Sequence, residues 1–338
     1  MKPAAPAQEA PGKNVSLLDR NVTTPISTPL IPPSDSRLFR LGTRGSPLAK
    51  WQAEWIAARL REQGIRVELV LITTSGDVTD GAISTVGGQG VFTKEIQRAL
   101  IDDRIDLAVH SLKDLPTEPV PGLILAAVPE RENPFDALIS TKSQTLEDLA
   151  PSAHVGTGSR RRQSQVLHLR PDLRVSEIRG NVDTRLRKLD EGQYDAIILA
   201  EAGLNRLGLA HRITQILPTA VMLPAVGQGA LGIETRADDS QTIAVVELLN
   251  HAPTHSAIIA ERELLAQLRG GCLAPIGAWA RTDGDFLRLT AAVLSPDGRR
   301  RISITMASKV ADPSALGRRA AHELLEMGAA ELIAASRG

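Results

Sequence analysis

The sequence contains very little sulfur, few aromatic side chains and no excess of either charge. Its 338 residues include one cysteine, Cys272, so an internal disulfide is impossible, which is typical of the reducing cytoplasm. Aromatic residues make up 2%, too few to build the stacking surfaces that bind single-stranded nucleic acid. The 39 basic residues balance 39 acidic ones, so we expect no electrostatic field of the whole molecule that attracts nucleic acid or an anionic membrane.

Long apolar runs are also missing. No stretch approaches the ~18 apolar residues of a transmembrane helix, and the N-terminus lacks the apolar segment of a secretory signal. The sequence therefore predicts a cytoplasmic protein that does not enter a membrane. Residues 1–36 are rich in Pro, Ala, Ser and Thr, and a segment of this kind buries too little apolar surface to offset its ordering entropy. We expect a flexible tail there.

From Arg37 onward, short apolar runs alternate with amphipathic segments, as in mostly parallel sheets with helices on both faces. Ser46 and Pro47 predict a helix start, because they supply an N-cap and a proline at the first helical position. Asn181 is placed to cap another helix. The predicted strands are 37–43, 65–74, 105–111, 123–129, 136–141, 154–159, 173–180 and 194–200.

After residue 240 the pattern predicts two helices, at 240–250 and 254–269, and an antiparallel meander over 276–310. A closing helix from about residue 313 is expected to pack four leucines onto the meander: Leu316, Leu324, Leu325 and Leu332.

The fold class predicted from these patterns is α/β, with two doubly wound domains and a smaller α+β C-terminal domain that contains an antiparallel sheet. We expect the first domain to comprise 37–132 and 228–249, the second 133–227 and the third 250–338, after the tail at 1–36.

Polar and basic residues gather where the predicted strands end. Open α/β sheets bind ligands outside the carboxyl ends of their strands. Over residues 159–212 arginine and lysine outnumber acids by eleven to seven, and the planar guanidinium suits carboxylates and phosphates. A basic run is often a solvated face, but its recurrence at strand ends favours an anion site.

Seven motifs, in this order, resemble those of porphobilinogen deaminases, also called hydroxymethylbilane synthases. They are GTRGSPLA, HSLKDLP, VGTGSRRRQ, IRGNVDTRLRKLD, YDAIILAEAGLNRLG, LPAVGQGALGIE and GGCLAPIGA, and the resemblance extends from Arg37 to the C-terminus. It implies two domains similar to periplasmic binding proteins, plus a third. It also implies a transferase of porphyrin and haem biosynthesis, monomeric by family precedent. Such an enzyme deaminates four porphobilinogen molecules and joins them head to tail into hydroxymethylbilane.

The resemblance further implies a dipyrromethane cofactor, attached covalently to Cys272. The residues around this cysteine suit that chemistry, because Gly270 and Gly271 let the backbone approach a ligand closely and a thiolate is a good nucleophile. The alternative for a lone cysteine is a small buried hydrophobic residue.

Asp114 is the expected catalytic residue. Loss of ammonia from porphobilinogen gives a cationic azafulvene. A carboxylate that accepts a hydrogen bond from the pyrrole N–H stabilises this cation more than the neutral substrate. The alternative is a surface aspartate in a turn before Pro116. The resemblance assigns the binding of cofactor and substrate to Arg44, Ser46, Ser111, Lys113, Thr157, Ser159, Arg161, Arg162, Arg179, Gly180, Arg185, Arg206 and Gln228.

Some of these predictions carry alternatives. Gln228 is equally consistent with hinge geometry between the domains and with a site contact. The glycine-rich segment 75–90 is expected to be a lid, or else a surface loop. The sequence departs from the family's common pattern at Gly158, Arg160, Thr85 and Gln89, which affects cofactor contacts rather than the reaction. No metal site is predicted.

Two other functions compete with this one. An anion-binding protein of the Venus-flytrap type would share the first two domains but would lack chemistry. A nucleic-acid-binding protein could use the arginine cluster, but the zero net charge and the few aromatics disfavour it.

Overall fold

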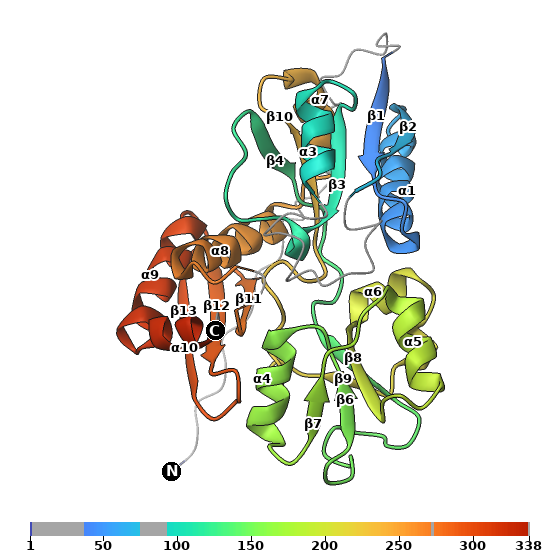
Figure 1. Ribbon diagram of the computed structural model, residues 1–338. Coiled ribbons are helices and arrows are strands. Elements are labelled where there is room, and N and C mark those ends of the chain that lie inside the picture. The colour runs from blue at the N-terminus through green and yellow to red at the C-terminus, as the bar shows by residue number, and fades with distance from the viewer. Residues whose placement is uncertain (2–36, 75–92, 272–273, 337–338) are drawn as a thin grey trace. The chain divides into compact units, whose positions relative to one another are not determined.

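The computed structural model describes residues 37–74, 93–271 and 274–336, besides Met1 (Figure 1). The predicted tail, the predicted lid and Cys272 lie outside the described residues. Three sheets organise the described part of the chain. Among the described residues, no helix combines the length and the apolar character needed to cross a bilayer.

The first sheet has five strands in the order β2-β1-β3-β10-β4. Strands β1, β2 and β3 are parallel, and β10 pairs antiparallel with both β3 and β4. The strands are β1 (Leu38–Thr43), β2 (Arg66–Leu71), β3 (Leu107–Ser111), β4 (Leu123–Ala127) and β10 (Leu231–Arg236), and the accompanying helices are α1 (Pro47–Glu62), α3 (Lys94–Ile101) and α7 (Ser240–Glu247).

The second sheet repeats this arrangement in the order β7-β6-β8-β5-β9, with β5 antiparallel to both neighbours. The expectation of mostly parallel sheets is confirmed, and each sheet has one reversed strand, β10 or β5, which is the strand entered when the chain crosses between the sheets. The strands are β5 (Asp136–Ser140), β6 (His154–Gly156), β7 (Arg174–Ser176), β8 (Ala196–Ala200) and β9 (Gln215–Leu217), and the helices are α4 (Arg160–Leu169), α5 (Val182–Asp190) and α6 (Glu201–Arg206).

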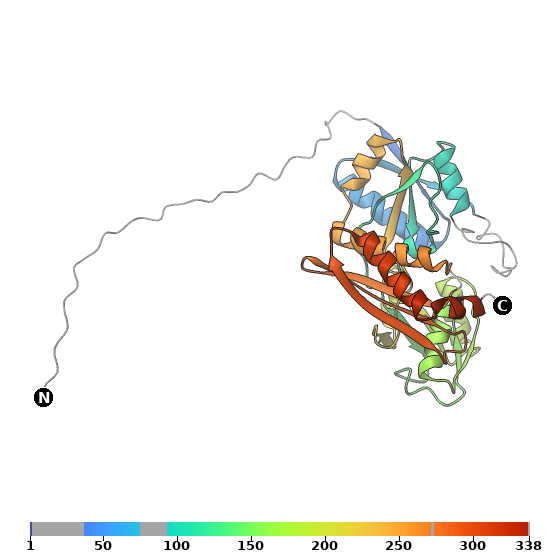
Figure 2. The same cartoon turned by 90° about the vertical axis from the view of Figure 1, so that its left-hand side faces the viewer.

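The third sheet is an antiparallel meander of β11 (Ile276–Asp283), β12 (Phe286–Leu294) and β13 (Arg301–Lys309). Its apolar face packs against α8 (Ala252–Leu268), α9 (Pro313–Glu326) and α10 (Ala329–Ala335), and Figure 2 shows the last two, in dark red, lying over the strands. The predicted fold class is confirmed, with two α/β domains and a smaller α+β domain.

The closing helix differs from the prediction in two respects. It ends at Glu326, and Gly328, with φ of +96°, separates it from α10. Leu325 is 37% exposed, whereas Leu316 and Leu324 are buried in the core. The expectation that Leu325 packs on the sheet is therefore wrong, because it lies beyond the edge of the buried stripe of α9.

Both predicted helix caps are present. The side chain of Ser46 accepts a hydrogen bond from the backbone N–H of Ala49, and Pro47 is the first residue of α1. Asn181 accepts from the N–H of Thr184 at 2.9 Å and starts α5. Both caps place a helix N-terminus directly after a strand or turn that carries a predicted site residue.

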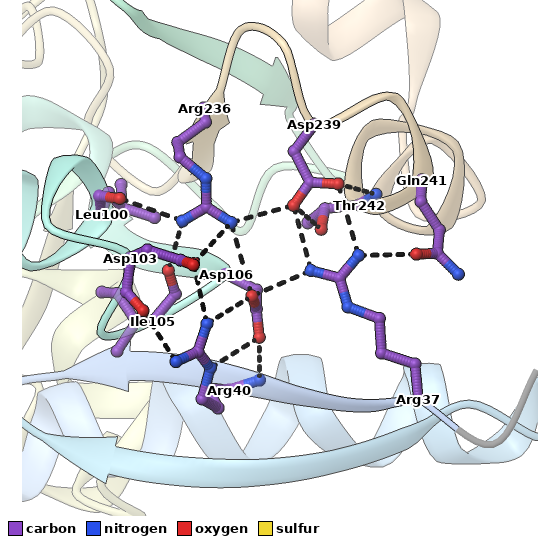
Figure 3. A network of polar contacts seen from close by, with 10 residues as sticks. All are labelled: Arg37, Arg40, Leu100, Asp103, Ile105, Asp106, Arg236, Asp239, Gln241 and Thr242. Atoms are coloured by element: carbon purple, nitrogen blue, oxygen red, sulfur yellow. Dashed lines mark hydrogen bonds and ion pairs between the residues drawn. The ribbon is translucent and has the colours of Figure 1, made fainter.

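A network of arginines and aspartates joins β1 to β10 and α7, at the opposite end of β1 from Arg44 (Figure 3). Asp106, with 2% of its side chain exposed, pairs with Arg37 at 2.9 Å and Arg40 at 2.8 Å. Asp239 pairs with Arg37 and Arg236 and caps α7. Burial by itself would raise the pKa of Asp239, but hydrogen bonds from Arg37 and Thr242 outweigh it and lower the pKa to about 2.

Replacing Asp106 by Asn is expected to lower the free energy of unfolding by about 1–3 kcal/mol at neutral pH, because it removes a buried carboxylate that accepts charged hydrogen bonds from Arg37 and Arg40. Urea unfolding measures the change. The depressed pKa values of Asp106 and Asp239 mean that this stabilisation is complete above about pH 5 and is lost progressively as the pH falls toward 2. The Asn variant should therefore lose less stability on acidification. Asp102→Asn is the control, since its exposed pairs with Arg98 and Arg104 are 3.6 and 3.8 Å long, and an equal loss in both variants would contradict the account.

Candidate active site

The turn that follows β3 carries the predicted catalytic residue. Leu112–Asp114 form a single 3-10 turn, in which Lys113 is half-buried and Asp114 is exposed. The backbone of Gly227 lies against this turn, since a Cβ there would be 3.1 Å from the backbone nitrogen of Lys113. With φ of +72° and no space for a side chain, this position requires glycine. The crossover from β9 to β10, residues 218–230, therefore supports the turn directly.

Two hollows flank Lys113. The Arg206 hollow is lined by Gln52, Ser111, Lys113, Arg206 and Gly229, among others. The Arg262 hollow is lined by Lys113, Leu115, Thr117, Arg262, Leu265 and Gly271, among others. Gly271 directly precedes Cys272 in the sequence, so the second hollow reaches the start of the predicted attachment segment.

Several predicted residues line the Arg206 hollow. Ser111 exchanges a hydrogen bond with the amide of Gln52, with 2.8 Å between Nε2 and Oγ. Arg206 donates to the carbonyl of Gly229 at 2.7 Å, and burial lowers its pKa to about 10. Arg44 follows β1 and is half-buried.

The predicted pair Arg161 and Arg162 is buried at the start of α4 and shares one carboxylate. Arg161 Nη1 lies 2.6 Å from Asp136 Oδ2, and Arg162 Nη2 lies 2.7 Å from Oδ1. Gln228 donates to the same Oδ1 at 2.8 Å and to the carbonyl of Pro134 at 2.6 Å. Asp136 is fully buried, and the two arginines outweigh the effect of burial and hold its pKa far below the usual range. Gln228 thus contacts the crossover from β4 to β5, residues 128–135, and lines neither hollow.

The hydroxyl residues before α4 order its N-terminus. Ser159 accepts from the N–H of Arg162, and Thr157 accepts from the N–H of Ser159 at 3.2 Å. A Cβ at Gly158 would be 3.1 Å from the carbonyl oxygen of Ile178 and 3.9 Å from Arg185 Nη2. A side chain here would therefore lie against the carbonyl oxygen of Ile178, within van der Waals distance of Arg185.

Arg179, Gly180 and Arg185 lie together at the start of α5. Arg185 Nε donates to the carbonyl of Gly180 at 2.7 Å, and Arg179 pairs with Glu177 at 2.8 Å. Burial lowers the pKa of Arg185 to about 10, Arg162 adds to the shift, and Asp114 opposes it.

Lys113 also interacts electrostatically with Asp114 and Arg162. Burial lowers its pKa to about 8; Asp114 opposes this shift and Arg162 adds to it. The structure therefore brings Lys113, Asp114 and the arginines of α4 and α5 close enough to influence one another's charge. No group of three or more His, Cys, Asp or Glu suited to a metal occurs in the part of the chain that the structure describes.

Asp136 was not predicted from the sequence as a component of the site. The available signal was an acidic residue at the head of an apolar strand, NPFDALIS, since a buried carboxylate requires a partner. Glu261 and Arg262 were not predicted either, because they lie within a helix whose sequence carries no motif of its own.

The comparisons with known proteins decide the family. Residues 39–244 match the family model described as "Porphobilinogen deaminase, dipyromethane cofactor binding domain", and residues 255–326 match the model of the C-terminal domain. The chain belongs to the porphobilinogen deaminase family. A porphobilinogen deaminase of Desulforudis audaxviator is 49% identical over 300 residues, which cover 88% of this chain and 97% of the relative. One of Geobacter metallireducens is 48% identical over 299 residues, covering 88% and 94%.

Family membership confirms the predicted resemblance, the dipyrromethane cofactor and the transferase activity in tetrapyrrole biosynthesis. It does not favour the alternative of a binding protein without chemistry. Among solved structures, the methionine-binding protein MetQ is 15% identical with a TM-score of 0.40, covering 62% of this chain and 89% of that one. At this distance the likeness says nothing about ligands.

Proposed function

We propose that this site deaminates porphobilinogen and joins four units head to tail into hydroxymethylbilane, as a hydroxymethylbilane synthase. The observation that carries the proposal is the convergence of Lys113, Asp114 and buried arginines at the strand ends of two domains in a member of this family. Acid-bearing pyrroles need both features, a carboxylate for the transient cation and guanidinium groups for the acetate and propionate side chains.

The residues present fit a bound dipyrromethane. Arg161 Nε is buried and has no hydrogen-bond partner among the described residues, so it retains a donor for a ligand carboxylate. We assign the cofactor side to Arg161, Arg162, Arg179 and Arg185, with Thr157 and Ser159, and the covalent attachment to Cys272. When bound, dipyrromethane supplies the pyrrole carbon to which the first substrate is joined.

Asp114 acts on the substrate's positive charge. Its carboxylate accepts a hydrogen bond from the pyrrole N–H as ammonia leaves, and this hydrogen bond strengthens as the ring nitrogen becomes cationic. Lys113, whose pKa is lowered to about 8, can hold or release a proton near neutral pH. We assign the incoming substrate to Arg44, Ser46, Ser111 and Arg206, of which Ser111 and Arg206 line the Arg206 hollow. We retain Gln228 and Gly180 as backbone-shaping members of the site.

Stoichiometry tests the proposed reaction. Incubation of the purified protein with porphobilinogen should release four ammonia molecules for each tetrapyrrole formed. Ammonia and tetrapyrrole can be measured in the same sample. Consumption of porphobilinogen without a linear tetrapyrrole would contradict the assignment. The cytoplasmic location, the monomeric state and the domain limits given above remain predictions.

Replacing Arg161 by Leu is expected to weaken ligand binding by about 2–5 kcal/mol, because a buried ligand carboxylate would lose its partner. The measured result should be a lower fraction of protein that carries the cofactor mass, or a raised KM. Arg174→Leu is the matched control, since Arg174 is exposed at the start of β7. Wild-type occupancy and KM in the Arg161 variant would remove this residue from the site.

A further inference from the structure

Helix α8 lies between two parts of the proposed site. One of its side chains, Arg262, reaches the turn that carries Asp114. Its C-terminal end, at Leu268, precedes Cys272 by four residues in the sequence. The helix therefore connects the catalytic turn with the segment that contains the predicted attachment site.

Arg262 forms hydrogen bonds with two backbone carbonyls of the catalytic turn. Its Nη1 donates to the oxygen of Leu115 at 2.9 Å, and its Nη2 donates to the oxygen of Pro116 at 2.6 Å. These are the two residues that follow Asp114. Because the guanidinium is planar and its donors have a fixed geometry, two such bonds fix the direction of the turn as well as its distance.

The neighbouring residue, Glu261, fixes the position of the helix. Its side chain is fully buried and accepts from Arg131 Nη1 at 2.6 Å, from the N–H of Gly227 at 2.7 Å and from the N–H of Ala280 at 2.8 Å. These partners belong to both crossovers and to β11. A helix tied to three segments in this way gives Arg262 a rigid base.

The Arg262 hollow lies between the structures that this side chain connects. The turn forms one wall through Lys113 and Leu115, and α8 with Gly271 forms the other through Leu265. Arg262 belongs to the α8 wall and bonds to the turn wall. It therefore links the two walls directly.

We propose that Arg262 is a positioning residue for the condensation, which holds the Asp114 turn at a fixed separation from the segment that leads to Cys272. The inference rests on the proposed function of Asp114. Arg262 contacts neither substrate nor cofactor in this role, and it acts through the backbone of residues 115 and 116. A lysine cannot reproduce it, because one ammonium group does not hold both carbonyls in the same geometry.

The test compares Arg262→Gln and Arg262→Lys in the holoenzyme. Small displacements of a catalytic group lower the rate on the order of 10- to 100-fold, so kcat should fall by that factor in the Gln variant. KM should stay within about twofold, and the cofactor mass and Tm should be retained, because the arginines of the site are unchanged. The kcat of the Lys variant should lie between those of the wild type and the Gln variant. Glu263→Gln is the control on the same helix, since the polar contacts of Glu263 are with Gln267 and Arg318 and not with the Asp114 turn.

Wild-type kcat in the Gln variant overturns the proposal, and so does a fall in kcat fully explained by lost cofactor or lost folded protein. If the Gln variant does not fold, the Lys variant decides by the same criterion. Asp114→Asn is measured in parallel. An active Asp114→Asn enzyme refutes the role of Asp114 on which the inference rests, whereas an inactive one beside a fully active Arg262→Gln enzyme refutes only the positioning role.

Discussion

Asp114→Asn is expected to retain the cofactor and to lose turnover on the order of 100- to 1000-fold. The substitution removes the negative charge but keeps the size of the side chain, and Asp114 is exposed, so folding should be unaffected. What disappears is the extra stabilisation of the cationic azafulvene relative to neutral porphobilinogen. Because this stabilisation is specific to the transition state, kcat and kcat/KM should fall together.

The measurement is steady-state kinetics on protein whose cofactor content has been checked by mass. Glu118→Gln provides the control, because Glu118 is an exposed carboxylate in the same loop and is expected to be silent. Near-normal turnover of the Asp114 variant would leave Asp114 as the surface aspartate that its sequence context alone allows.

The second large effect is expected for Cys272→Ser, which should fold but carry no cofactor and show no turnover above background. A serine hydroxyl is a far weaker nucleophile than a thiolate near neutral pH, so the bond to the pyrrole should not form. The intact mass of the variant should equal that of its polypeptide. The wild type, produced in the same host, should be heavier by one dipyrromethane.

Ser256→Ala is a suitable companion, since it removes a hydroxyl from α8 without altering the attachment segment. It should keep the adduct. An adduct of normal mass on the Cys272→Ser protein would place the attachment elsewhere and would refute the assignment.

The sequence predicted the parts of the fold that depend on neighbouring residues. The caps at Ser46 and Asn181 each bind an N–H three residues further on, so a short window contains both partners. Strand ends followed by Lys113 or Arg179 were equally visible, because apolar runs stop there. The antiparallel meander was visible from its alternation and its turns.

Contacts between distant residues could not be predicted in the same way. Asp136 meets Arg161 and Arg162 across 25 and 26 residues and Gln228 across 92, so no local pattern identifies it as their shared partner. Arg262 reaches Leu115 across 147 residues. The reversed strands β5 and β10 were hidden for the same reason, since their direction depends on where the chain crosses between sheets.

The central claim is that the chain grows covalently on this protein while Asp114 stabilises each transient cation. Mass spectrometry of the intact protein, before and after brief exposure to porphobilinogen, tests it most directly. The account predicts one cofactor increment at the start and then a ladder of species, each heavier by one pyrrole unit. A protein that weighs no more than its polypeptide, or that forms tetrapyrrole without any heavier species, would contradict it.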